Sequence, residues 1–299
     1  MQVGLIGLGR MGFNMGLRLL GRGQPLAAYN RNPQKTRELA AKGAAAAGSL
    51  NELVRLLTPP RALWIMLPAE LVEERIADLA ALLTPGDLII DGGNSRYLDD
   101  PPRHARLAEL GLHYLDVGVS GGIRGLSEGY CLMVGGDAAD YARLTPIFDA
   151  LCAPGGHLHC GPAGSGHYVK MIHNAIEYGL MQAYGEGFEL LLNGPYGDDM
   201  DLAAVARLWN RGSVVRSWLL ELLGQALTAD GRLEGLRGWV EDSGEGRWSL
   251  EEAVRSATAV PVTALALMQR FRSRRADTFS DKVVAALRRE FGGHSTKQV

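Results

Sequence analysis

Short apolar runs alternate with helical patterns through the first half of the chain. Runs with the length and composition of buried strands lie at 2–6, 26–29, 62–66, 88–91, 113–117, 130–134 and 157–160. Helical patterns lie at 70–83, 101–110 and 138–151, and another follows the first run and ends near Gly21. This alternation predicts a mostly parallel sheet with helices on both faces.

The second half has almost no strand pattern. It predicts one long helix over 166–192, in spite of three glycines, and further helices over 202–211, 214–226, 250–257, 262–273 and 282–291. The turn-forming segment 161–164 separates the two halves. We therefore expect an α/β domain over 1–163 and an all-helical domain over 164–299.

Composition and charge exclude some classes of partner. The 299 residues are 46% apolar and 21% charged, and the formal net charge of -2 gives no general attraction to nucleic acid or to an anionic membrane. Three cysteines without CxxC spacing favour a reducing compartment. No basic leader precedes the first strand, and no apolar run approaches membrane-spanning length. We expect a cytoplasmic protein without nucleic-acid or membrane partners.

A glycine-rich turn follows the first predicted strand directly. The series Gly7-Leu8-Gly9-Arg10-Met11-Gly12 opens a helix. Such glycines allow a tight turn, close approach to a pyrophosphate and close helix–strand packing, and the first N–H groups of the helix attract phosphate. A plain glycine-rich turn is the alternative. The strand before the motif and the helix after it favour a dinucleotide site in a Rossmann-type, doubly wound sheet.

The end of the second strand bears on the choice of cofactor. An NAD site usually has Asp or Glu there for the ribose hydroxyls, whereas this chain has Asn30, Arg31 and Asn32. A guanidinium can pair with a 2′-phosphate through two hydrogen bonds. The sequence therefore favours NADP over NAD, although Arg31 could instead stack on the adenine of either cofactor.

Two loops at predicted strand ends carry polar groups. Asp91-Gly92-Gly93-Asn94-Ser95 follows one strand, and Val119-Ser120-Gly121-Gly122 follows another. Ligands bind at the carboxyl ends of strands in open α/β sheets. The N–H groups of Gly121 and Gly122, with the Ser120 hydroxyl, could hold a carboxylate. Each loop alone is more typical of a simple turn.

The long predicted helix carries four polar residues on one face. Lys170, His173, Asn174 and Glu177 stand at i, i+3, i+4 and i+7. A lysine and a glutamate two turns apart can present a base and an acid to one small molecule. A solvated polar stripe is the alternative. We expect no metal, because the sequence has no HExxH motif and no Cys/His cluster.

Together these motifs resemble the decarboxylating 6-phosphogluconate dehydrogenases, in their short bacterial form with one helical domain, within the 3-hydroxyacid dehydrogenase superfamily. The resemblance rests on the glycine turn, the two strand-end loops and the series Lys170-x-x-His173-Asn174-x-x-Glu177-Tyr178-Gly179. It implies oxidative decarboxylation of 6-phospho-D-gluconate to D-ribulose 5-phosphate in the pentose phosphate pathway, with NADP or NAD as the oxidant.

The resemblance also implies roles for single residues. Lys170 would be the general base, Glu177 would protonate the product carbon, and Asn94 would contact both cofactor and substrate. The other implied substrate ligands are Ser120, Gly121, Gly122, His173 and Asn174 for the carboxylate and hydroxyls, and Tyr178, Arg247, Arg272, Arg288 and His294 for the phosphate. A homodimer or homotetramer is implied, in which the C-terminal tail completes the neighbour's site.

Two other functions fit part of the pattern. A non-decarboxylating 3-hydroxyacid dehydrogenase, acting on 3-hydroxyisobutyrate or tartronate semialdehyde, keeps the lysine but lacks a glutamate at the position of Glu177. A catalytically silent dinucleotide-binding module has little reason to keep Lys170 and Glu177 on one face. The sequence therefore favours the decarboxylating enzyme.

Overall fold

The computed structural model describes residues 2–292 and 295 and divides into two compact units, Met1–His173 and Asn174–Val299. The first unit contains an eight-stranded sheet with the order β3-β2-β1-β4-β5-β6-β7-β8. Neighbouring strands are parallel except for β6 and β7, which confirms the mostly parallel sheet. The strands are β1 (Val3–Ile6), β2 (Leu26–Tyr29), β3 (Ala45–Ala47), β4 (Ala62–Ile65), β5 (Leu88–Asp91), β6 (His113–Ser120), β7 (Tyr130–Gly136) and β8 (Cys152–Gly161).

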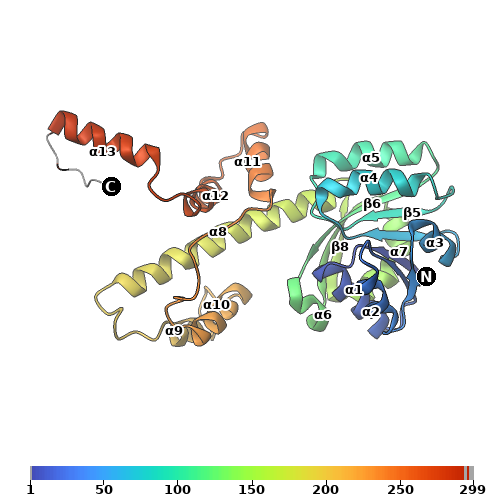
Figure 1. The fold of residues 1–299 in the computed structure, drawn as a ribbon, viewed down its shortest axis with the longest axis horizontal. Coiled ribbons are helices and arrows are strands. Elements are labelled where there is room, and N and C mark those ends of the chain that lie inside the picture. Colours follow the sequence, from blue (N-terminus) through green and yellow to red (C-terminus); the bar gives the residue numbers. More distant parts are fainter. Residues whose placement is uncertain (1, 293–294, 296–299) are drawn as a thin grey trace. The chain divides into compact units, whose positions relative to one another are not determined.

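Helices cover both faces of this sheet, as Figure 1 shows for α4 and α5 on one of them. Successive side chains of β1 therefore enter two different cores: Leu5 packs with α1 and α7, and Ile6 with α3, α4 and α5. Burial on both sides explains why the central strands appear in the sequence as unbroken apolar runs. The helices of this unit are α1 (Arg10–Gly21), α2 (Pro33–Ala40), α3 (Leu50–Leu56), α4 (Ala69–Ala80), α5 (Asp100–Ala108), α6 (Gly125–Glu128) and α7 (Ala138–Leu151), with 3-10 turns at Tyr97–Asp99 and Gly122–Arg124.

Parallel pairing places four polar turns at one edge of the sheet. Gly7 follows β1, Asn30 follows β2, Gly92 follows β5 and Gly121 follows β6. At this edge β1 lies between β2 and β4, where the direction of the chain's progress across the sheet reverses. Open α/β sheets bind ligands at such a point.

The second unit contains helices only among its described residues. Helix α8 (Ser165–Asn193) begins in the first unit and ends in the second. The others are α9 (Leu202–Trp209), α10 (Trp218–Ala229), α11 (Glu245–Arg255), α12 (Pro261–Ser273) and α13 (Phe279–Gly292). One core joins Phe188 of α8 to α9 and α10, and a smaller core joins Tyr178 to α12. None of the described helices meets the length and hydropathy needed to cross a membrane.

Several predicted boundaries were wrong. Helix α10 begins at Trp218 and not at 214, because the Ser217 hydroxyl accepts a hydrogen bond from the Leu220 N–H at 3.0 Å and caps the helix there. Helix α11 begins five residues before the predicted start, so Arg247 lies within it. Strand β8 begins at Cys152 and not at 157, and β6 continues to Ser120.

Candidate active site

The glycine turn has the shape that a pyrophosphate requires. Gly7 has φ +93°, and an added Cβ there would lie 2.4 Å from the carbonyl oxygen of Met66. At Gly12 an added Cβ would lie 2.1 Å from the carbonyl oxygen of Gly7, whereas at Gly9 it would meet nothing within 4 Å. Gly7 and Gly12 therefore allow close packing, and Gly9 leaves the backbone at the start of α1 open to a ligand.

Side-chain amides fix the loop that follows β2. The Leu8 N–H donates to Asn30 Oδ1 at 2.9 Å, and Asn30 Nδ2 donates to the carbonyl oxygen of Asn32 at 3.0 Å. Asn32 Oδ1 caps α2 by accepting from the Gln34 N–H at 3.0 Å. Arg31 is exposed between the two asparagines. The loop is thus tied to the glycine turn, with the Arg31 guanidinium at its surface.

Asp91 shapes the turn that carries Asn94. One carboxylate oxygen of Asp91 accepts from the Gly93 N–H at 2.9 Å, and the other accepts from the Ser95 hydroxyl at 2.7 Å. An added Cβ at Gly92 would lie 2.1 Å from the indole nitrogen of Trp64, so the turn lies directly against β4. Asn94 is half-buried within this turn.

Helix α8 lies directly against β6 at Lys170. An added Cβ at Gly118 would be 2.3 Å from the Cβ of Lys170, so only glycine permits this approach. One turn later, His173 Nε2 lies 3.4 Å from the Ser120 hydroxyl. Gly121 and Gly122 follow with φ values of +121° and +51°. The first unit therefore brings Lys170, His173 and Ser120 together beside the turn at Gly121.

Buried carboxylates hold the start of α8. Asp116 accepts from the N–H groups of Gly164 at 2.7 Å and His167 at 2.8 Å. His167 Nδ1 lies 2.8 Å from Asp100 Oδ2. Burial opposes a charge on His167, but the contact with Asp100, together with the nearby Asp91 and Asp116, raises the pKa of His167 to about 10. His167 is therefore protonated at neutral pH.

The second unit fixes the polar residues that follow along α8. Asn174 Nδ2 donates to a carboxylate oxygen of Glu245, and the other oxygen accepts from the Ser243 hydroxyl at 2.7 Å. The Ser243 N–H donates to the Tyr178 hydroxyl at 3.4 Å. Glu177, beside Tyr178 in the chain, is half-buried.

Arginines gather in a cleft of about 460 Å³ in the second unit. It is lined by Arg247, Phe271, Arg272, Arg274 and Arg275. Arg247 and Arg274 each lie 2.6 Å from a carboxylate oxygen of Asp242, and Arg272 lies 2.6 Å from Asp281. The hydrogen bond from Arg247 lowers the pKa of Asp242. Four cations around one cleft are suited to a phosphate group.

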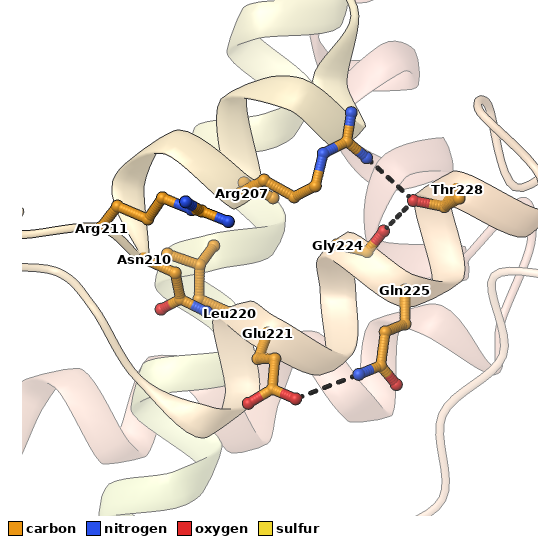
Figure 2. A pocket seen from close by; sticks show the side chains of 9 residues that line it. Arg207, Asn210, Arg211, Leu220, Glu221, Gly224, Gln225 and Thr228 are labelled. Carbon is orange, nitrogen blue, oxygen red and sulfur yellow. Dashed lines mark hydrogen bonds between the residues drawn. The ribbon is translucent and has the colours of Figure 1, made fainter.

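Of the five predicted phosphate ligands, Arg247 and Arg272 line this cleft, and Tyr178 is not among its lining residues. Arg288 lies on the exposed helix α13 and is not among the lining residues, and His294 lies outside the described residues. A separate cavity of about 430 Å³ lies between α9 and α10 (Figure 2). There Arg207 donates to Thr228 and Gln225 to Glu221. No predicted site residue lines that cavity.

The sequence did not point to several residues that build these groups. Asp100, Asp116 and His167 are buried charges, and Gly118 is a strand glycine without a motif. Asp91 was within a recognised turn, but its role as the acceptor that folds the turn was not apparent. The signal that could have indicated this role is the position of Asp91 itself, at the end of an apolar strand and before two glycines.

Two family descriptions match the sequence. The "NAD binding domain of 6-phosphogluconate dehydrogenase" matches residues 2–163, and the "6-phosphogluconate dehydrogenase, C-terminal domain" matches residues 166–296. The chain belongs to the 6-phosphogluconate dehydrogenase family. This confirms the family and the fold class that the motifs predicted.

Relatives within the 6-phosphogluconate dehydrogenase family cover the whole chain. The Bacillus subtilis protein YqeC is 47% identical over 298 residues, which is 100% of each chain. An NAD(+)-dependent, decarboxylating 6-phosphogluconate dehydrogenase of Haloferax volcanii is 43% identical over 297 residues, 98% of each. The Plasmodium falciparum 6-phosphogluconate dehydrogenase, solved apo, with NADP+ and with 6-phosphogluconate, superposes with a TM-score of 0.85 at 29% identity. The match covers 98% of this chain and 65% of the Plasmodium chain.

Proposed function

We propose that the protein catalyses oxidative decarboxylation of 6-phospho-D-gluconate to D-ribulose 5-phosphate and CO2, with NAD(P) as the oxidant. The proposal is carried by α8, an uninterrupted helix of this family's second half on which Lys170 and Glu177 stand two turns apart. A dehydrogenase that only oxidises its substrate needs the base but not the acid. Glu177 therefore favours a decarboxylating reaction.

The first unit fits a dinucleotide cofactor. The open backbone at Gly9 and the start of α1 suit its pyrophosphate, and Asn30, Arg31 and Asn32 lie at the end of β2, where the adenosine ribose belongs. When bound, the dinucleotide accepts the hydride that leaves C3 of the substrate. Asn94, at the same edge of the sheet, contributes to both cofactor and substrate binding.

Lys170 and Glu177 divide the proton transfers. Lys170 takes the proton of the 3-hydroxyl as the C3–H leaves as a hydride, which gives a 3-keto acid. The bond between C1 and C2 then breaks, CO2 leaves, and its electron pair delocalises into the new carbonyl. The ammonium of Lys170 stabilises the resulting enolate oxygen. Glu177 donates a proton to the former C2, which becomes C1 of ribulose 5-phosphate.

The remaining residues bind and orient the substrate. Ser120 and the N–H groups of Gly121 and Gly122 hold the carboxylate, and Asn94, His173 and Asn174 hold the hydroxyls. Arg247 and Arg272, which line the arginine cleft, bind the phosphate together with Tyr178. Arg288 and His294 complete the phosphate site from a partner subunit.

The deciding experiment mixes the purified protein with 6-phosphogluconate and NADP or NAD, and follows both reduced nicotinamide and released CO2. We expect equal molar amounts of the two products. Reduction without CO2 would instead support a non-decarboxylating 3-hydroxyacid dehydrogenase. No reaction with any 3-hydroxyacid would support a silent binding module.

The proposal extends to a preference for NADP, supported by the exposed Arg31 and the absence of an acid at the end of β2. Arg31→Ala should lower kcat/KM for NADP by roughly 10- to 100-fold, because a charge-assisted pair with the 2′-phosphate is lost, and change that for NAD little. Arg37→Ala, also exposed and on α2, is the matched control. A wild-type protein that prefers NAD, or equal losses with both cofactors in Arg31→Ala, would contradict this preference.

We also propose a homodimer or a homotetramer formed by two dimers, acting in the cytoplasm. Helix α13 supports the oligomer, since its apolar side chains Phe279, Val284 and Leu287 are 80%, 57% and 58% exposed. An amphipathic helix with an exposed apolar face is suited to packing against a second copy. The three cysteines are free, as expected in a reducing compartment.

A further inference from the structure

A buried group of charges lies behind the start of α8. Asp91, Asp100 and Asp116 are fully buried, and the cations among them are His167 and Arg103, which are 2% and 5% exposed. We propose that His167 is a positioning residue, whose imidazolium holds the Asn94 turn and the Lys170 segment of α8 in their catalytic arrangement through these carboxylates. The inference rests on the proposed function, because it concerns the site of that reaction.

Each carboxylate holds a different segment of the site. Asp91 folds the Asn94 turn through the Gly93 N–H and the Ser95 hydroxyl. Asp116 accepts from the N–H groups of Gly164, just before α8, and of His167, three residues before Lys170. Asp100 bonds to the His167 side chain itself, and it also accepts from the Tyr114 hydroxyl at 2.8 Å. The segment that follows the Asn94 turn also contacts the start of α8 directly, because the rings of Tyr97 and Tyr168 pack edge to face at 5.0 Å.

Protonation of His167 sets two cations, instead of one, against the three buried carboxylates. Arg103 lies 3.3 Å from Asp91 and 3.6 Å from Asp100, and it also pairs with the exposed Glu73 at 2.9 Å. It cannot compensate three buried carboxylates alone. Burial already raises the pKa of Asp116, so loss of the His167 charge would drive a proton onto a carboxylate that must accept two N–H groups.

Charge, rather than a second hydrogen bond, holds the imidazole. Among the described residues His167 Nε2 is buried and has no hydrogen-bond partner, so Nδ1 makes the one hydrogen bond, to Asp100. A glutamine can keep a neutral hydrogen bond to Asp100 without the charge. The two contributions can therefore be separated by substitution.

The test compares His167→Gln with the double variant His167→Gln/Asp100→Asn. The single variant should lower kcat by about 100-fold while the Kd for the reduced dinucleotide stays within about twofold, because misplaced catalytic groups lose turnover. The kcat of the double variant should be about tenfold higher than that of His167→Gln, because the double variant removes one carboxylate together with the cation. His159→Gln, whose Nε2 bonds to the Gly136 carbonyl at 2.8 Å, is the control and should behave as wild type. A double variant no better than the single one, in kcat and in unfolding midpoint, would overturn the proposal.

A second measurement does not depend on catalysis. The pKa of His167 rises from an ordinary 6.5 to about 10 on folding. Its contribution to stability is therefore complete below pH 6.5 and is lost as the pH rises through about 10. The urea midpoint of wild type should fall more steeply between pH 6.5 and 10 than that of His167→Gln. Equal slopes of urea midpoint against pH would show that His167 carries no stabilising charge, and would overturn this proposal. A steeper wild-type slope in a protein that does not turn over 6-phosphogluconate would overturn only the proposed reaction.

Discussion

Lys170 and Glu177 stand on parts of α8 with different surroundings, although one helix carries both. The backbone of Lys170 is fixed by its contact with Gly118, whereas Glu177 stands beside Tyr178, whose ring lies 3.4 Å below the Arg270 guanidinium. The helical spacing of the two residues could be predicted, because it follows from a 3.6-residue repeat. Their supporting charges could not. Asp100, Asp116 and His167 are buried only by contacts distant in the sequence.

Glu177→Gln tests the proposed acid. Glutamine has nearly the same shape but cannot donate a carboxylic proton, so steady-state turnover should fall by at least about 100-fold. Hydride transfer precedes this step, and a first-turnover burst of reduced dinucleotide should therefore remain in stopped-flow absorbance.

Glu186→Gln is the matched control for this substitution. Glu186 is exposed on the same helix, where it accepts from Gln182 at 2.8 Å, and its loss should leave turnover unchanged. If Glu177→Gln weakened dinucleotide binding as much as turnover, Glu177 would have a structural role instead.

Among the elements, the central strands were predicted within a residue or two, and the segment 33–56 was missed. The strands β1, β4 and β5 have strong apolar runs because helices cover both of their faces. Strand β3 consists of three alanines at the sheet edge, which carry almost no strand signal. The early start of α11 was missed because Gly244 and Gly246 are poor helix formers. Gly246 is required there, since an added Cβ would lie 2.7 Å from the Tyr178 ring.

The contact between β6 and α8 leads to a prediction for Gly118→Ala. The new methyl group would lie 2.3 Å from Lys170 Cβ and 3.0 Å from the Gly166 carbonyl oxygen, so strand and helix must separate. A small displacement of a catalytic base is costly, and kcat should fall by roughly 100-fold. Dinucleotide affinity, measured by fluorescence titration, should change little because the glycine turn follows β1 and not β6.

Gly21→Ala provides the comparison for a glycine without neighbours. An added Cβ at Gly21 meets nothing within 4 Å, so this variant should keep the turnover of wild type. Unchanged kcat in Gly118→Ala would show that α8 can shift without effect on the chemistry.

At the scale of the whole molecule, the two units contain different parts of the proposed site. The glycine turn, Ser120 and Lys170 belong to Met1–His173, and Glu177 with the arginine cleft belongs to Asn174–Val299. The expected boundary at 163/164 stays a prediction, as do the roles of the single site residues. The residue roles go beyond what sequence predicts, because helix periodicity does not say which copy of the chain a C-terminal residue such as Arg288 serves.

Subunit complementation tests the partner's contribution. If Arg288 serves the neighbouring subunit, Lys170→Ala and Arg288→Ala should each be nearly inactive as homodimers. A mixed dimer has one intact site, which combines Lys170 of one chain with Arg288 of the other. Equimolar mixing with full subunit exchange should therefore restore about a quarter of wild-type activity, since half of the dimers are mixed and each has one active site of two. Lys170→Ala with Glu177→Gln should give no recovery, because both changes lie on α8 of the same chain. Exchange verified by co-purification of differently tagged chains, without recovery of activity, would show that Arg288 does not complete a neighbour's site.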